Sequence, residues 1–240
     1  MKRKPLILML TLFSLFVFTA CTKQASPPPA TPETPGLEDG VKAFQTLLEK
    51  YPKQVGYHEE LSHWGFTPEE GYKFEWSSNA SANKADFALV LPAEALVSAG
   101  LKVDQLDPSI FLFEPGGTDS MGMAQADRLI FPYELSEKAT ESKSSGEAFS
   151  SLMALDPELI MYHPEGQHYI LNLGDGNEVI WTEDLSLNEK DMLLVLNAAP
   201  LVSAGLDLTK LTGGWEFVPS GNEGMVPNPD QIRIAFNLKN

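Results

Sequence analysis

The four histidines of this 240-residue chain form two pairs with matching neighbours. His58 and His63 are separated by four residues, and so are His163 and His168. Both pairs fit the pattern Tyr-His-x-Glu-x-x-His-aromatic, whose polar members are His58, Glu60, His63, His163, Glu165 and His168. Imidazole nitrogens and carboxylate oxygens are ligands that Zn²⁺ and Cu²⁺ accept. The motif therefore indicates two related sites for metal chemistry.

The residues around each pair predict two short strands joined by a tight turn. In such a hairpin His58 lies opposite His63 on one face, and Tyr57 lies opposite Trp64 on the other face. We expect the aromatic rings to pack inward and the imidazoles to face solvent. Each motif supplies three ligands, whereas a closed structural zinc site has four. Binding of Zn²⁺, Cu²⁺ or a metallocofactor such as haem is thus one hypothesis. The other is that both copies inherited ordinary hairpin residues from one ancestor.

The histidine motifs belong to a longer duplication. Residues 41–101 align without a gap on residues 146–206, with 23 identities in 61 pairs, whereas chance gives about four. The longest shared phrase is Leu-Val-Ser-Ala-Gly-Leu, at residues 96–101 and 201–206. The sequence predicts two related units, 40–136 and 147–240, joined by a polar linker at 137–146. Each unit is long enough to bury a core of its own.

The predicted elements repeat in the two units, and they describe an α+β fold that occurs twice. Helices are predicted at Val41–Lys50 and Ala148–Leu155, followed by hairpins, a short helix that ends at a glycine, and two further strands. The predicted strands are Gln54–His58, His63–Thr67, Lys73–Ser77, Ile110–Phe113 and Leu129–Leu135 in the first unit, and Leu159–His163, His168–Leu173, Glu178–Thr182, Trp215–Val218 and Gln231–Leu238 in the second. The apolar runs 86–91 and 191–196 fit either a buried strand or the start of a helix. Gly100 and Gly205 are expected to be the left-handed helix caps.

The first residues of the chain have the composition of an export signal. Three basic residues precede an apolar stretch from Leu6 to Phe18, and residues 1–20 end directly before Cys21, the only cysteine. The junction Phe18-Thr19-Ala20-Cys21 resembles the lipobox of bacterial lipoproteins. That resemblance implies cleavage before Cys21 and acylation of its thiol with diacylglycerol, which would hold the protein on the extracytoplasmic face of a membrane. Residues 21–39 are rich in proline and predict an extended tether.

The composition narrows the choice of function. The net charge is −16, and a surface of this sign repels phosphate backbones, so we expect no nucleic-acid partner. The chain has no nucleophile elbow, no phosphate-binding glycine loop and, apart from Cys21, no thiol nucleophile. The leading hypothesis is a lipid-anchored, non-enzymatic binding or scaffolding module for a protein, glycan or small molecule. The alternatives are metal handling at the histidine motifs and hydrolysis of cell-envelope polymers.

Overall fold

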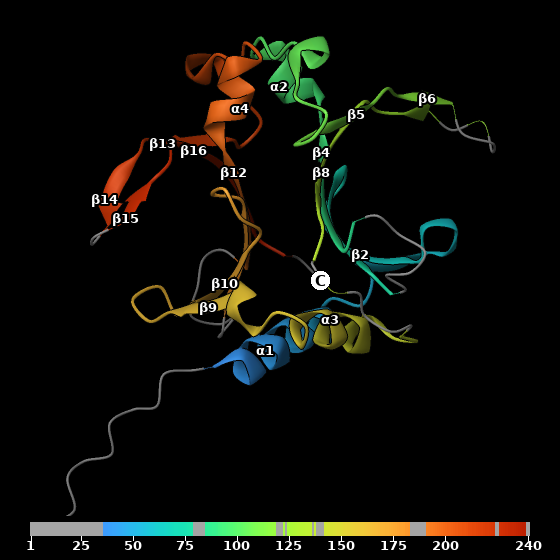
Figure 1. Cartoon of the computed structure of the whole chain (residues 1–240). Helices are drawn as coiled ribbons and strands as arrows, with labels where there is room; N and C mark the ends of the chain where they lie inside the picture. The colour runs from blue at the N-terminus through green and yellow to red at the C-terminus, as the bar shows by residue number, and fades with distance from the viewer. Residues whose placement is uncertain are drawn as a thin grey trace, which may run out of the picture. The chain divides into compact units, whose positions relative to one another are not determined.

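The computed structural model describes residues 36–78, 85–118, 122, 124–135, 137, 142–182, 191–223 and 226–238. The chain from Thr34 to Asn240 forms one compact unit. It contains both helices and antiparallel sheets, as the predicted α+β class requires (Figure 1). Within the described residues, no helix is long and apolar enough to cross a membrane. The predicted export signal, Cys21 and most of the tether lie outside the described residues.

The first repeat contains a six-stranded antiparallel sheet in the order β1-β2-β3-β4-β8-β5. Its elements are α1 (Leu37–Lys50), β1 (Val55–His58), β2 (His63–Glu69), β3 (Tyr72–Ser77), β4 (Phe87–Pro92), α2 (Glu94–Ser98), β5 (Leu112–Glu114), β6 (Gly117–Thr118), β7 (Ala124–Gln125) and β8 (Arg128–Tyr133). Strands β6 and β7 form a separate small hairpin.

The second repeat builds an equivalent sheet in the order β13-β16-β12-β11-β10-β9. Its elements are α3 (Ser145–Met153), β9 (Ile160–His163), β10 (His168–Asn172), β11 (Glu178–Thr182), β12 (Met192–Asn197), α4 (Ala198–Ser203), β13 (Glu216–Val218), β14 (Gly221–Glu223), β15 (Val226–Asn228) and β16 (Gln231–Phe236). Strands β14 and β15 pair with each other outside this sheet.

The long helices begin before their predicted starts. Helix α1 begins at Leu37, where the N–H of Gly36 donates to Asp39 Oδ2 at 3.0 Å. Helix α3 begins at Ser145, because the Ser144 hydroxyl accepts a hydrogen bond from the N–H of Glu147. This first turn of α3 falls within the predicted linker 137–146.

The two ambiguous apolar runs are central strands, β4 and β12. Each lies between two hydrogen-bonded neighbours, and its sequence is buried almost throughout. The aspartate directly before each of these strands accepts a backbone hydrogen bond at the end of the sheet. Asp86 accepts a hydrogen bond from the Leu135 N–H at 2.8 Å, and Asp191 accepts one from the Leu238 N–H at 2.6 Å.

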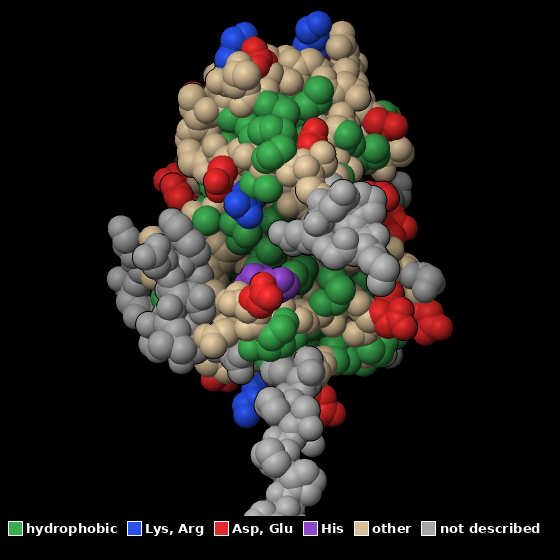
Figure 2. Space-filling model, turned by 90° about the vertical axis from the view of Figure 1, so that its left-hand side faces the viewer, with side chains coloured by type: hydrophobic (Ala, Val, Ile, Leu, Met, Phe, Trp, Pro, Cys, Tyr) green, Lys and Arg blue, Asp and Glu red, His purple; other side chains and the backbone are tan. Residues whose placement is uncertain are grey.

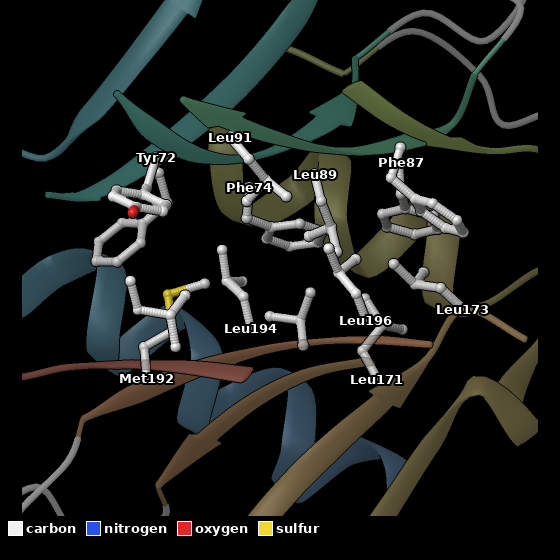
Figure 3. Packing of buried hydrophobic residues seen from close by; sticks show 14 of the residues in the cluster. Tyr72, Phe74, Phe87, Leu89, Leu91, Leu171, Leu173, Met192, Leu194 and Leu196 are labelled. Carbon is white, nitrogen blue, oxygen red and sulfur yellow. The ribbon is translucent and has the colours of Figure 1, made fainter. Parts of the chain in front are cut away.

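The two sheets face each other across one hydrophobic core (Figure 3). Side chains of β3 and β4, such as Phe74 and Leu89, meet side chains of β10 and β12, such as Leu171 and Leu194. The core is a single cluster that draws on both repeats. The expectation that each repeat buries a core of its own is therefore wrong, because one face of each sheet is covered by the other sheet.

The long helices close one end of this core by crossing between repeats. Helix α1 packs on β9 of the second repeat, whereas α3 packs on β2 and β3 of the first (Figure 1). The indole N–H of Trp76 donates to the carbonyl oxygen of Ser145, at the start of α3, at 2.9 Å. Gly40 makes the crossing of α1 possible, since a Cβ there would lie 2.7 Å from the Ile160 side chain.

The shared phrase forms the opposite end of the core, where α2 and α4 meet. The Lys102 N–H donates to Ala204 O and the Asp207 N–H donates to Ala99 O, each at 2.9 Å. This reciprocal exchange is what an approximate two-fold relation between the repeats produces. Gly100 and Gly205 have φ values of +102° and +95°, as their predicted cap role requires. A Cβ on either would lie about 3 Å from the carbonyl oxygen of the other.

Candidate functional site

The structure confirms the predicted pairing of the histidines. Strands β1 and β2 bring His58 opposite His63, with Tyr57 opposite Trp64. Strands β9 and β10 repeat this register with His163 opposite His168. Each pair lies at the end of its hairpin next to the turn. The two pairs nevertheless have different surroundings.

In the first repeat the histidines share a buried carboxylate that the sequence motif does not contain. Glu75 of β3 places Oε1 3.6 Å from His58 Nε2 and Oε2 3.8 Å from His63 Nδ1. Lys73 donates to His58 Nε2 at 3.1 Å. Gly65, directly across the ladder from Glu75, has no side chain and leaves room for the carboxylate. Alternation along β3 places Glu75 on the face opposite the core residues Phe74 and Trp76, but no local pattern in the sequence relates it to the histidines.

These contacts set the protonation of the first cluster. Burial raises the pKa of Glu75, but the nearby His63, Lys73 and His58 outweigh it, so the pKa lies below its ordinary value. Burial and the charge of Lys73 lower the pKa of His58. The cluster is therefore arranged around an ionised Glu75 and a neutral His58 at pH 7.

The second histidine pair lacks this carboxylate. Its imidazole rings stack almost in parallel, 7° apart, with centroids separated by 5.0 Å. Ile180 occupies the position of Glu75, and Glu178 occupies that of Lys73. The N–H of Gly166 in the turn donates to His163 Nδ1 at 3.2 Å. Burial and the charge of His163 lower the pKa of His168, so its ring is neutral at pH 7 and a ring nitrogen can accept a hydrogen bond.

The expected orientation of the motif is only partly correct. Tyr169 is buried as expected, but Tyr57 is 46% exposed and His63 only 6% exposed. The outer face of the first sheet buries His63 because Glu75 lies beside it, and His63 Nε2 contacts Ala85 O at 3.3 Å.

The structure provides no assembled metal centre for the motif. Among the described side chains, no group of three or more His, Cys, Asp or Glu residues is placed to hold a metal ion. Glu165 is exposed in its turn, and the Glu60 side chain lies outside the described residues. Metal binding by the motif stays a prediction.

A groove lies on the outer face of the second sheet. Its volume is about 350 Å³, within the range of small-molecule sites. It crosses five strands of the sheet, and its lining includes His168, Ile180, Thr182, Asp191, Leu193, Glu216, Arg233 and Ala235. Hydrophobic side chains are exposed in this hollow, with histidine and charged side chains beside them (Figure 2).

An apolar row forms the middle of the groove. Ile180 lies directly opposite Leu193, and Leu193 lies opposite Ala235. All three side chains are half-buried. In the first sheet the positions of Ile180 and Leu193 are taken by Glu75 and Ala88, so the equivalent surface carries the charged cluster instead of an apolar row. The two outer faces have thus diverged while the core positions stayed apolar.

The two ends of the groove are polar. At one end Thr182, paired with His168, is only 7% exposed, and its hydroxyl has no hydrogen-bond partner in the described part of the chain. At the other end the Arg233 guanidinium contacts Glu216, with Nε 3.3 Å from Oε2. Among these residues only His168 belongs to the sequence motif. Ile180 and Leu193 were visible only as apolar residues of predicted or ambiguous segments.

Comparisons with protein-family models, with curated proteins and with solved structures found no match to this chain.

Proposed function

We propose that this protein is a lipid-anchored, non-catalytic binding protein of the extracytoplasmic face of a bacterial membrane, and that its ligand occupies the groove of the second sheet. The ligand is a small molecule with an apolar body. Support for the anchor comes from the lipobox-like junction at Cys21. Support for the binding role comes from the apolar groove with a polar group at each end.

The row of half-buried apolar side chains between charged groups is the observation that carries the binding role. Ile180, Leu193 and Ala235 offer apolar contact to a ligand. His168 and Asp191 lie at one end of this row and Arg233 at the other, where polar groups can orient the ligand. The groove therefore has the composition of a binding site, in which a few polar groups orient an apolar ligand.

Ligand-observed NMR with a library of small amphipathic molecules tests the binding role. We expect hits that bind the chain from Thr22 onward and lose binding in Leu193→Glu, which places a charge in the middle of the groove. Val97→Glu is the matched control, because Val97 is exposed and lies outside the groove lining. Hits that bind both variants equally, or a library without hits, would contradict the binding role.

Membrane fractionation tests the anchor. We expect the wild-type chain in the membrane fraction with a diacylglycerol-modified Cys21, detected by mass spectrometry. Cys21→Ser should remove the modification and the lipid-dependent membrane attachment, whereas the neighbouring Thr22→Ser should change neither. An unmodified Cys21 in the exported wild-type protein would refute the proposed anchor.

Metal binding at the histidine pairs is the second candidate function, and the shared face of each pair in the observed hairpins favours it. Calorimetric titration of Zn²⁺ and Cu²⁺ tests it against the double variant His63→Ala, His168→Ala. Two equivalents bound at micromolar affinity or tighter, and lost in the double variant, would establish it. If the wild type gives no heat of binding, or if the double variant gives the same heat as the wild type, the histidines have a structural role and do not bind metal.

A further inference from the structure

The two polar ends of the groove differ in the hydrogen-bonding groups that they present. The Thr182 end presents two groups that can accept a hydrogen bond from a ligand, which are the neutral His168 ring and the Asp191 carboxylate. One Asp191 oxygen already accepts from the Leu238 N–H. Asp191 adds a negative charge to this end, and the neutral imidazole adds none. This end of the groove favours a positively charged donor, such as an ammonium group.

The opposite end presents a donor. Arg233 has five N–H bonds, and its Nε contact with Glu216 leaves the terminal nitrogens for a ligand. A guanidinium of this kind binds a carboxylate with paired hydrogen bonds. Its side chain is 37% exposed, so a ligand can reach it from the open side of the groove. The pair of Arg233 and Glu216 carries no net charge, so a carboxylate at this end would be bound by the remaining N–H groups of Arg233, whereas Asp191 gives the other end a negative charge.

The strand register fixes the length of a ligand that reaches both ends. The Thr182 N–H bonds to Asp191 O, and Val195 of the same strand lies opposite Arg233. Thr182 and Arg233 are therefore separated by two strand spacings across the sheet and four residues along it, or about 16 Å between backbones. The Arg233 side chain shortens the remaining gap. An extended peptide of about four or five residues spans this distance.

We infer that the ligand of the groove is a short apolar peptide with free ends, bound in extended form with its ammonium group at His168 and Asp191 and its carboxylate at Arg233. The apolar side chains of the peptide lie on Ile180, Leu193 and Ala235. This inference rests on the proposed binding role of the groove and specifies the ligand that fills it.

Titration calorimetry with four forms of one tetrapeptide tests the inference. The probe is alanyl-leucyl-alanyl-leucine with free ends, acetylated at its N-terminus, amidated at its C-terminus, or blocked at both ends. The protein is the chain from Thr22 onward, which contains the whole compact unit Thr34–Asn240. We expect the peptide with free ends to bind. Acetylation or amidation should each weaken binding about tenfold, because each removes one charge-assisted contact.

Two variants assign the ends of the peptide to the ends of the groove. Arg233→Gln should weaken binding of the free peptide about tenfold and leave the affinity of the amidated peptide unchanged. Asp191→Asn removes the negative charge at the other end and keeps an oxygen for the Leu238 N–H, so it should weaken binding of the free peptide but not of the acetylated one. Arg128→Gln is the matched control, because Arg128 forms a similar half-exposed pair with Glu114 on the first sheet. It should change no affinity.

The outcomes separate this inference from the proposed function. Equal binding of all four peptides in the groove, or binding of other library molecules but of no peptide, overturns the peptide inference and leaves the binding role standing. If Arg233→Gln weakens the free and the amidated peptides equally, the assigned direction is wrong. If neither peptides nor library molecules bind, both the inference and the proposed binding role fail.

Discussion

The rings of Phe44 and Phe149, which occupy the same position in the two repeats, lie with their centroids 4.2 Å apart. Each ring also contacts the tryptophans of both sheets, Trp76 and Trp181. A duplicated residue that contacts its own copy marks the local two-fold relation between the repeats. The duplication therefore produced one body with two outer faces rather than two separate domains.

The Phe44 and Phe149 contact predicts strong coupling between the repeats. Phe44→Leu and Phe149→Leu should each lower the free energy of unfolding by about 1–2 kcal/mol. Because the rings share one cluster, the double variant should deviate from the sum by at least about 0.5 kcal/mol. Urea denaturation measures this. Phe44→Leu combined with Phe111→Leu, whose ring contacts Phe131 instead, should be additive. Additivity in both cycles would show that the repeats fold independently.

The close approach of Gly100 and Gly205 predicts intolerance to any side chain at either position. Gly100→Ala combines a φ of +102° with a Cβ 3.0 Å from the Gly205 carbonyl oxygen. We expect it to lower the free energy of unfolding by about 2 kcal/mol or more. Gly56→Ala is the control, since a Cβ at Gly56 has no neighbour within 4 Å and its φ is not positive. Equal stability of the two variants in thermal denaturation would argue against the contact between α2 and α4.

The unpartnered hydroxyl in the groove predicts a gain in stability when it is removed. Thr182→Val replaces the hydroxyl with a methyl group of similar size, so the free energy of unfolding should stay equal or rise by about 1 kcal/mol. Thr182→Ser keeps the hydroxyl and removes a buried methyl group, so it should destabilise the fold by about 1 kcal/mol. Calorimetric melting of both variants distinguishes them. A Thr182→Val variant that melts well below the wild type would mean that the hydroxyl has a structural partner.

The shifted pKa values predict lower stability in mild acid. Burial lowers the pKa of His58 and of His168, so the unfolded chain binds more protons than the folded one below pH 6.5. The free energy of unfolding should therefore fall as the pH drops through that value. The pKa of Glu75 is also lowered, so its contribution is lost at still lower pH, as the carboxylate becomes protonated in the folded state.

Denaturation of the double variant His58→Gln, His168→Gln measures the histidine part of this effect. The wild type should lose stability between pH 7.5 and pH 5.5, and the variant should lose less. Glu75→Gln should weaken the dependence near pH 4 and keep that near pH 6, since Asp107 and Asp207 also have lowered pKa values. A double variant with the full wild-type loss between pH 7.5 and pH 5.5 would show that other groups cause it.

Local sequence patterns were sufficient to predict most of the elements and the pairing within each histidine hairpin. The opposition of His58 with His63 follows from a short turn between two alternating strands, and both are determined by residues close in sequence. The left-handed conformation at Gly100 follows in the same way from a glycine after a short helix. The duplication further ensured that a prediction for one repeat held for the other.

Only the tertiary structure decided which segments that are far apart in sequence contact each other. Local periodicity cannot relate residues that are far apart in sequence. Such residues meet where α1 packs on β9, in the single core between the two sheets, and where Glu75 lies beside His63. The runs that became β4 and β12 were ambiguous for the same reason, since a segment buried on both sides has no periodic signal. The groove likewise exists only because β10, β11, β12, β16 and β13 lie side by side, which brings Asp191 and Arg233 to opposite sides of one apolar row.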